Sequence, residues 1–192
     1  MAEDKRALVW ERITEFIAAK TYCTVSLALS DNPERQGIIL KATHEWVQIL
    51  SSFDVQPDGV AFLKIQHIDK VRPFSKFVQK VMRNDDMRAL VSGEPLADMQ
   101  STAALLRWLA KRPEYITIEF SEKDNEIFYI GKPLRVSSKS LSFFGFDTNG
   151  KWWKTPRKVA MSDISIITYK SPYAEFYRKH MTAALSPERK LK

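Results

Sequence analysis

Two kinds of hydrophobic spacing run along this chain, and each predicts a different element. Val9, Ile13, Phe16 and Ile17 follow the i, i+4, i+7, i+8 spacing of an amphipathic helix that buries one face. Residues 23–29 instead alternate apolar with smaller or polar side chains, which predicts a half-buried strand. The chain therefore opens with a helix followed by strands.

The same order returns in the second half. Leu105, Leu106 and Leu109 mark one stripe of a helix, and residues 115–120 alternate between apolar and polar positions. Further short apolar runs, separated by turn residues, follow in each half. We predict one unit used twice: a helix, four or five short strands, and a closing helix.

Matched motifs support an internal repeat. Residues 74–82 and 173–181 both fit aromatic-x-x-Phe-x-x-Lys-x-Met, and Gly37 and Gly131 open matching segments upstream. Chance similarity between two β-rich segments is the alternative. Agreement in order and spacing across several elements favours duplication.

The predicted boundary lies between the copies. Residues 84–98 are rich in Asn, Asp, Ser, Gly and Pro, which stop helices and form turns. Asp98 or Ser101 is a candidate N-cap for the next helix. We predict three parts: a first small-barrel unit at 1–90, a second, basic unit at 96–186, and a basic tail at 187–192.

Short antiparallel strands with a leading helix can hide both faces of their sheet by closing into a small barrel. The order resembles the Sm-like small-barrel family in its leading helices, in the glycines Gly37 and Gly131, and in the tight links into residues 68–71 and 163–166. The resemblance implies a mainly β fold with flanking α-helices: two tandem small bent antiparallel β-barrels, each with a leading and a closing helix.

Several Sm features are missing from this sequence. The glycine-rich signature before the last strand, the uridine-stacking aromatic motif and the histidine-containing motif of the bacterial RNA-chaperone branch are all absent. The resemblance therefore implies neither ring assembly nor the family's RNA pocket, and a fold by itself does not specify a function.

Charge separates the two halves more sharply than hydropathy does. The chain of 192 residues carries a net charge of +7. Residues 1–110 hold 14 basic and 14 acidic side chains, whereas residues 111–192 hold 16 and 9, so the whole excess belongs to the second half. An excess of this kind favours an anionic partner.

The excess concentrates between residues 131 and 158, where seven basic side chains face only Asp147. Residues 151–158 occupy the place of the apolar segment 60–65 in the first copy. We predict a basic hairpin strand on which Trp152 and Trp153 point to opposite faces, one of them exposed. The candidate ligand-binding residues are Lys132, Arg135, Lys151, Trp152, Trp153, Lys154, Arg157 and Lys158.

Three interpretations of this surface remain open at the level of sequence. Lys and Arg would neutralise the phosphates of RNA or single-stranded DNA while an exposed indole stacks on a base. The same surface suits an acidic protein partner, as in an immunity-type or adaptor protein. It is also typical of a solvated basic edge that prevents aggregation. The aromatic helix positions are Phe74, Phe77, Tyr173 and Phe176. Their rings would seal their own barrel, bind the other copy or form a homodimer contact, and the sequence does not choose among these.

The sequence favours a non-enzymatic protein. His67 and Asp69 are two apart and would share one face of a strand, but no nucleophile can be placed beside them. The three histidines show no metal-ligand spacing, and no nucleotide-binding or nucleophile motif is present, so we expect no cofactor and no metal. A single cysteine, Cys23, and the lack of a signal or membrane span predict a cytoplasmic protein without a membrane partner.

Overall fold

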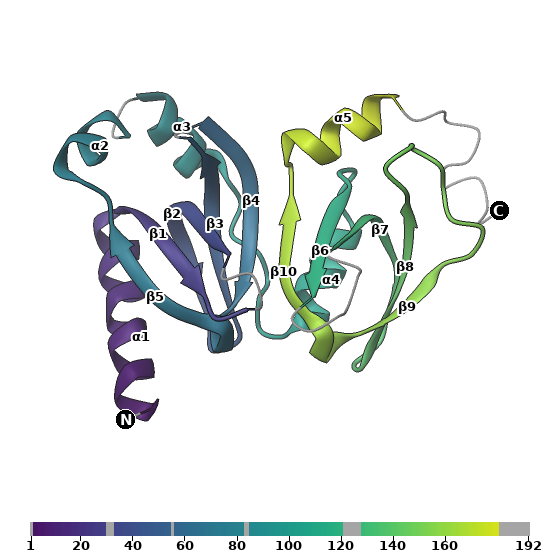
Figure 1. Cartoon of the computed structure of the whole chain (residues 1–192), viewed down its shortest axis with the longest axis horizontal. Coiled ribbons are helices and arrows are strands. Elements are labelled where there is room, and N and C mark those ends of the chain that lie inside the picture. The colour runs from purple at the N-terminus through teal and green to yellow at the C-terminus, as the bar shows by residue number, and fades with distance from the viewer. Residues whose placement is uncertain (1, 30–32, 55, 83–84, 121–127, 181–192) are drawn as a thin grey trace.

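The computed structural model describes residues 2–29, 33–54, 56–82, 85–120 and 128–180. All its strands belong to one antiparallel ten-stranded sheet with the order β5-β1-β2-β3-β4-β10-β6-β7-β8-β9 (Figure 1). The sheet curls into two halves that lie side by side, which we call the first unit (α1 to α2) and the second unit (α4 to α5).

The first unit begins with a long helix. Its elements are α1 (Ala2–Ala19), β1 (Tyr22–Leu27), β2 (Glu34–Ala42), β3 (Trp46–Phe53), β4 (Gln56–Lys64), the 3-10 turn η1 (Ile65–His67), β5 (Ile68–Pro73) and α2 (Lys76–Val81). Helix α3 (Asp85–Gly93) follows it. The second unit comprises α4 (Thr102–Ala110), β6 (Ile116–Phe120), β7 (Phe128–Val136), β8 (Ser140–Phe146), β9 (Arg157–Ala160), the 3-10 turn η2 (Met161–Asp163), β10 (Ile164–Tyr169) and α5 (Pro172–His180).

The same strand pairing occurs in both units. β1 pairs with β2 and β5, and β6 pairs with β7 and β10. The ladder shifts register at Ile39/Lys41 in the first unit and at Pro133/Arg135 in the second. Each last strand is entered through a three-residue 3-10 turn. The elements that the sequence predicts to repeat therefore also pair in the same way, while the exact domain boundaries stay predictions.

The predicted closure into two barrels is wrong. β4 does not turn back towards β5; it pairs with β10 of the second unit, with Leu63 opposite Ile166 and Val60 opposite Tyr169. Because an edge can pair with only one neighbour, this junction keeps the first unit open and joins the two units into one sheet. The second unit is open as well, since β9 is a short edge strand of four residues.

A shared core accompanies the shared sheet. Phe62 of β4 and Tyr169 of β10 stack with ring centroids 5.8 Å apart, and the Trp108 ring of α4 meets both edge-on. These residues belong to one apolar cluster that runs from Tyr22 in the first unit to Phe143 in the second. Such a cluster makes the units interdependent.

The segment between the units is not the turn-rich linker that the sequence predicts. Residues 85–93 form α3, and the extended chain after it is fixed against the first unit. The buried Gln48 amide donates to the Pro95 carbonyl and accepts from the Ala97 N–H, both at 3.0 Å, while Lys41 Nζ donates to the Ala97 carbonyl. These contacts join residues between 47 and 56 positions apart in the sequence, which local patterns cannot show.

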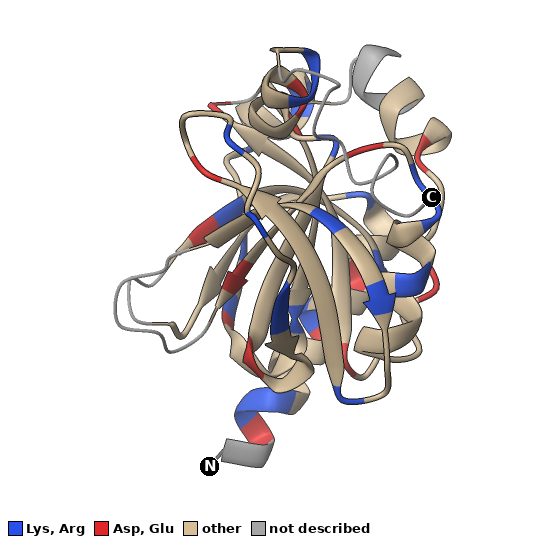
Figure 2. Ribbon diagram, turned by 90° about the vertical axis from the view of Figure 1, so that its right-hand side faces the viewer, with Lys and Arg blue, Asp and Glu red and all other residues tan. Residues whose placement is uncertain are grey.

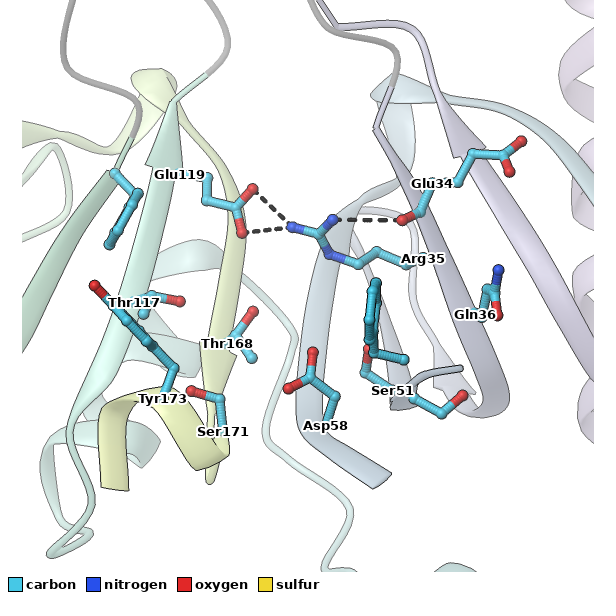
Figure 3. A pocket seen from close by; sticks show the side chains of 13 residues that line it. Glu34, Arg35, Gln36, Ser51, Asp58, Thr117, Glu119, Thr168, Ser171 and Tyr173 are labelled. Atoms are coloured by element: carbon cyan, nitrogen blue, oxygen red, sulfur yellow. Dashed lines mark hydrogen bonds and ion pairs between the residues drawn. The ribbon is translucent and has the colours of Figure 1, made fainter. Parts of the chain in front are cut away.

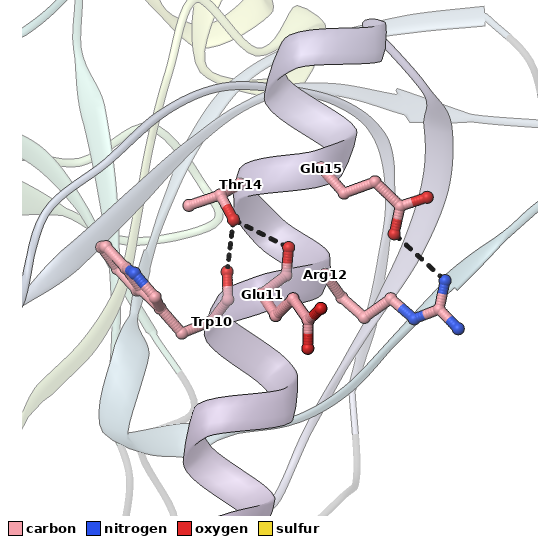
Figure 4. Close-up of polar contacts among 5 residues, drawn as sticks. All are labelled: Trp10, Glu11, Arg12, Thr14 and Glu15. Carbon is pink, nitrogen blue, oxygen red and sulfur yellow. Dashed lines mark hydrogen bonds and ion pairs between the residues drawn. The ribbon is translucent and has the colours of Figure 1, made fainter.

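The leading helix confirms the predicted amphipathic pattern. Ile13 and Phe16 are buried against the sheet, where α1 lies along β2 and β5. Its outer side is polar: Thr14 Oγ1 donates back to the carbonyls of Trp10 and Glu11, and Arg12 pairs with Glu15 (Figure 4). Among the helices of the described residues, none combines the length and the apolar character needed to cross a membrane.

Candidate anion-binding surface

The predicted basic strand is shorter than expected. β9 begins only at Arg157, and residues 147–156 form a loop. Trp152 in this loop forms an isolated β-bridge with Phe146 at the end of β8. The Asp147 carboxylate accepts hydrogen bonds from the N–H groups of Asn149 and Lys151, which closes a local turn. Such side-chain bonds compete with strand pairing and explain why the ladder stops here.

The two tryptophans point into different clusters, as the sequence predicts, but neither stands free on the surface. Trp152 is only 6% exposed and lies parallel to Phe144, with centroids 5.1 Å apart. Trp153 is half-buried and meets Tyr129 and Phe143 edge-on. The sequence predicted that one of the two indoles is exposed; Trp152 is the buried one, and Trp153 is only half-buried.

Arg157 stacks on Trp153 and does not project freely. Its guanidinium carbon lies 4.3 Å from the Trp153 ring centroid and 5.1 Å from that of Tyr129, whose hydroxyl accepts a hydrogen bond from Arg157 at 3.1 Å. The same indole ring lies so close to Gly145 that a Cβ there would come within 2.6 Å. A base would have to displace Arg157 before stacking on this ring.

Three of the predicted cations share one face of the sheet. Arg135 lies opposite Ser142, and Ser142 lies opposite Lys158, so this row crosses β7, β8 and β9 on one side. Lys132 lies opposite Phe144, two residues from Ser142, and therefore belongs to the same face. We call Lys132, Arg135 and Lys158 the basic strip; Arg135 and Lys158 are exposed, and Lys132 is half-buried.

The remaining candidates lie elsewhere. Arg157 is opposite Phe143 and so faces the other side of the sheet. Lys151 and Lys154 are exposed in the loop of residues 147–156, outside the strand register. Figure 2 looks onto this side of the second unit and shows Lys and Arg distributed over several of its strands and loops. The eight predicted residues thus divide into the strip of three, the loop pair Lys151 and Lys154, the stacked pair Arg157 and Trp153, and Trp152, which is buried in a separate cluster.

The groups considered for catalysis are engaged in other contacts. Asp69, the predicted partner of His67, binds Lys5 of α1. His44 stacks on Trp10 with centroids 5.7 Å apart. Burial raises the pKa of the Cys23 thiol to about 12, so it stays protonated near neutral pH. In the described part of the chain, no group of three or more His, Cys, Asp or Glu side chains could hold a metal ion.

The aromatic helix positions proposed for a dimer contact are only partly available. Phe74 packs on Tyr22, with centroids 4.8 Å apart. Phe77 is 75% exposed, and Tyr173 and Phe176 are exposed on α5. A homodimer stays a prediction that rests on these three rings.

Sequence reasoning missed a cleft between the two units. It has a volume of about 350 Å³ and lies beside the β4–β10 junction, with Arg35 and Asp58 on one side and Glu119 and Tyr173 on the other (Figure 3). Arg35 bridges the units through both Glu119 oxygens, at 2.6 and 2.8 Å. Carboxylates outnumber basic groups in the lining, so this cleft does not suit a polyanion. Only the pairing of β4 with β10 brings these residues together.

The Asp58 carboxyl in this cleft makes stability depend on pH. Burial raises its pKa, and nearby Arg35 lowers it to a lesser degree. A raised pKa favours the protonated folded state, so its contribution is present at low pH and is lost as pH rises through the folded pKa. We expect Asp58→Asn to raise the melting temperature at about pH 7. This gain in melting temperature should shrink as the pH falls to about 4. Thermal unfolding at several pH values checks this, and a gain that grows on acidification would contradict it.

No family model, no curated protein and no solved structure matches this chain. A functional assignment for this chain therefore rests on its own residues.

Proposed function

We propose that the protein is a non-enzymatic binding module whose second unit holds a nucleic-acid polyanion, RNA or single-stranded DNA. The observation that carries the proposal is the basic strip, which presents Lys132, Arg135 and Lys158 on one face of three adjacent strands. Neighbouring strands are spaced by about 4.8 Å, so a row across three strands spans roughly one to two nucleotides of a backbone. The exposed loop cations Lys151 and Lys154 extend the positive potential beyond it.

The structure changes how such a ligand would be held. Trp152 is buried and Trp153 is covered by Arg157, so base stacking is not part of the proposal. Binding would rest on phosphate contacts, which position a strand without reading its sequence. The proposed partner is therefore bound with little sequence preference.

An acidic protein partner is the competing proposal, because the same cations would serve it. The chain would then act as an adaptor or an immunity-type protein. The cytoplasmic setting and the kinship with Sm-like small barrels, in an opened form, are likewise proposals; the strand pairing repeated in both units supports the second of these.

The salt dependence of oligonucleotide binding tests the main proposal. For single-stranded DNA, the slope of log K against log salt is about −0.7 per neutralised phosphate. Changing Lys132, Arg135 and Lys158 together to Gln should reduce the steepness of that slope by about 2 and weaken binding at least tenfold near 50 mM salt. Fluorescence anisotropy with a labelled oligothymidine gives both quantities.

A matched control removes the same charge from the other unit. Lys70, Lys76 and Lys80 are exposed on β5 and α2, and their triple change to Gln should leave the slope unchanged. Equal losses in both variants would show that net charge alone attracts the oligonucleotide. If the unaltered protein binds no oligothymidine at about 50 mM salt, nucleic acid is rejected as the ligand and the acidic-protein alternative is favoured.

A further inference from the structure

Lys64 is a buried lysine without a carboxylate partner. It ends β4 and is 7% exposed, and its Nζ lies 3.4 Å from the carbonyl oxygens of Met161 and Ser162 in η2. Those distances exceed the usual 2.7–3.2 Å of a hydrogen bond, and the ammonium also lies 5.9 Å from the Trp46 ring centroid. None of the ion pairs found among the described residues involves Lys64. A buried ammonium is costly unless it is paired with an anion.

This ammonium lines a pocket formed by both units. The pocket has a volume of about 500 Å³ and lies where the end of β4 meets the first turn of α4, the β7–β8 turn and η2. Arg107 of α4 supplies a second cation, and the hydroxyls of Ser101, Ser138 and Ser162 line the same space. Two cations beside serine side chains supply donors of the kind that a phosphate group needs, and of these hydroxyls the one of Ser162 already donates to Asp163 at 2.9 Å.

The one acidic side chain in the lining is already engaged. Both Glu45 carboxylate oxygens bind Thr102 at the start of α4, one to its N–H at 3.1 Å and the other to its hydroxyl. Glu45 therefore balances the positive end of that helix, and Lys64 and Arg107 remain as the cations without a carboxylate. The net charge of the lining is +1, which suits one phosphate group better than a long polyanion.

We propose that this pocket binds a single phosphate group between Lys64 and Arg107. Ser138 lies in the turn that follows Arg135, and η2 directly follows β9, which carries Lys158, so the pocket lies at the ends of strands that bear two residues of the basic strip. The phosphate group belongs either to free phosphate or to the 5′ end of an oligonucleotide that follows the strip. The second source rests on the proposed function, whereas the phosphate site itself does not.

Isothermal titration with inorganic phosphate at constant ionic strength tests the site. We expect saturable binding that weakens about tenfold or more in Lys64→Met and in Arg107→Gln, because hydrogen bonds to charged groups are lost. Lys64→Met replaces a buried charge by an apolar chain of similar length, which removes the cost of burying an ammonium without an anion. Arg107 is exposed, so its variant reports on the site even if Lys64→Met unfolds.

Lys111→Gln is the matched control, since it removes an exposed charge next to α4 outside the pocket. Absence of saturable phosphate binding, or equal weakening in Lys111→Gln, would overturn the proposal. Oligothymidine with and without a 5′-phosphate then separates the two sources. A preference for the phosphorylated end that Lys64→Met abolishes, and the triple strip variant keeps, supports the oligonucleotide end; phosphate binding without such a preference supports free phosphate.

Failure of the phosphate pocket and failure of the proposed function give different results in these experiments. Oligonucleotide binding that survives while phosphate does not bind would reject this pocket and leave the strip intact. Phosphate binding without oligonucleotide binding would do the reverse.

Discussion

Replacing Gly37 by alanine is expected to destabilise the protein by about 3 kcal/mol or more. Gly37 has a φ of +153°, which side chains rarely adopt, and a Cβ built on it would lie 2.0 Å from the Leu50 carbonyl oxygen of β3. Neither the backbone of β2 nor that of β3 can move away without breaking the ladder. Gly131 has the same geometry, with φ +154° and the Phe144 carbonyl oxygen at 2.1 Å, so Gly131→Ala should cost a similar amount.

Urea unfolding followed by circular dichroism measures both losses. Gly93→Ala is the control, because no atom lies within 4 Å of a Cβ built there and the residue ends α3. It should leave the free energy of unfolding unchanged or raise it by up to about 1 kcal/mol. A Gly37→Ala variant within about 0.5 kcal/mol of the unaltered protein would show that the strands can separate at this point.

Trp46→Ala should be comparably damaging, with an expected loss of about 3–5 kcal/mol. Trp46 is fully buried in the shared core. Its indole N–H donates to the Thr102 hydroxyl at 3.1 Å, which ties β3 of the first unit to the first turn of α4. Truncation would leave a cavity and remove this hydrogen bond at the same point, while the Thr102 hydroxyl would keep its bond to Glu45.

Calorimetry and denaturant unfolding with two probes test this prediction. Trp10→Ala is the matched control: Trp10 is only partly buried and stacks on the exposed His44, so its loss should cost clearly less. Because both units share one core, Trp46→Ala should lower the midpoint of a single unfolding transition, and the two units should still unfold together. Two separate transitions, one for each unit, would contradict the shared core.

Local patterns predicted most of the elements but not how the two units join. The helical spacing of Val9 to Ile17 and the alternation of residues 115–120 correspond to α1 and β6. Pairing between Leu63 and Ile166 depends instead on residues far apart in the sequence, for which periodicity carries no information. An apolar segment such as residues 60–65 reads the same whether its edge closes a barrel or joins a second unit.

The division of the predicted cations between the two faces of the sheet could not be predicted for a similar reason. The sequence located the cations, yet their faces depend on the register shift between Pro133 and Arg135, which brings Arg135 to the side of Lys132. Counting alternate residues from Lys132 would have placed Arg135 on the opposite face. The covering of Trp153 by Arg157 and the burial of Lys64 likewise follow from tertiary contacts.

The junction between β4 and β10 also bears on the chain as it leaves the ribosome. Residues Val60–Lys64 of β4 are buried in the finished protein, and half of their ladder comes from a strand made much later. Until β10 emerges, the nascent first unit carries an unpaired apolar edge, which is the kind of surface that templates aggregation. Truncation before the second unit would make that exposure permanent, so we expect the isolated N-terminal half to aggregate more readily than the whole chain.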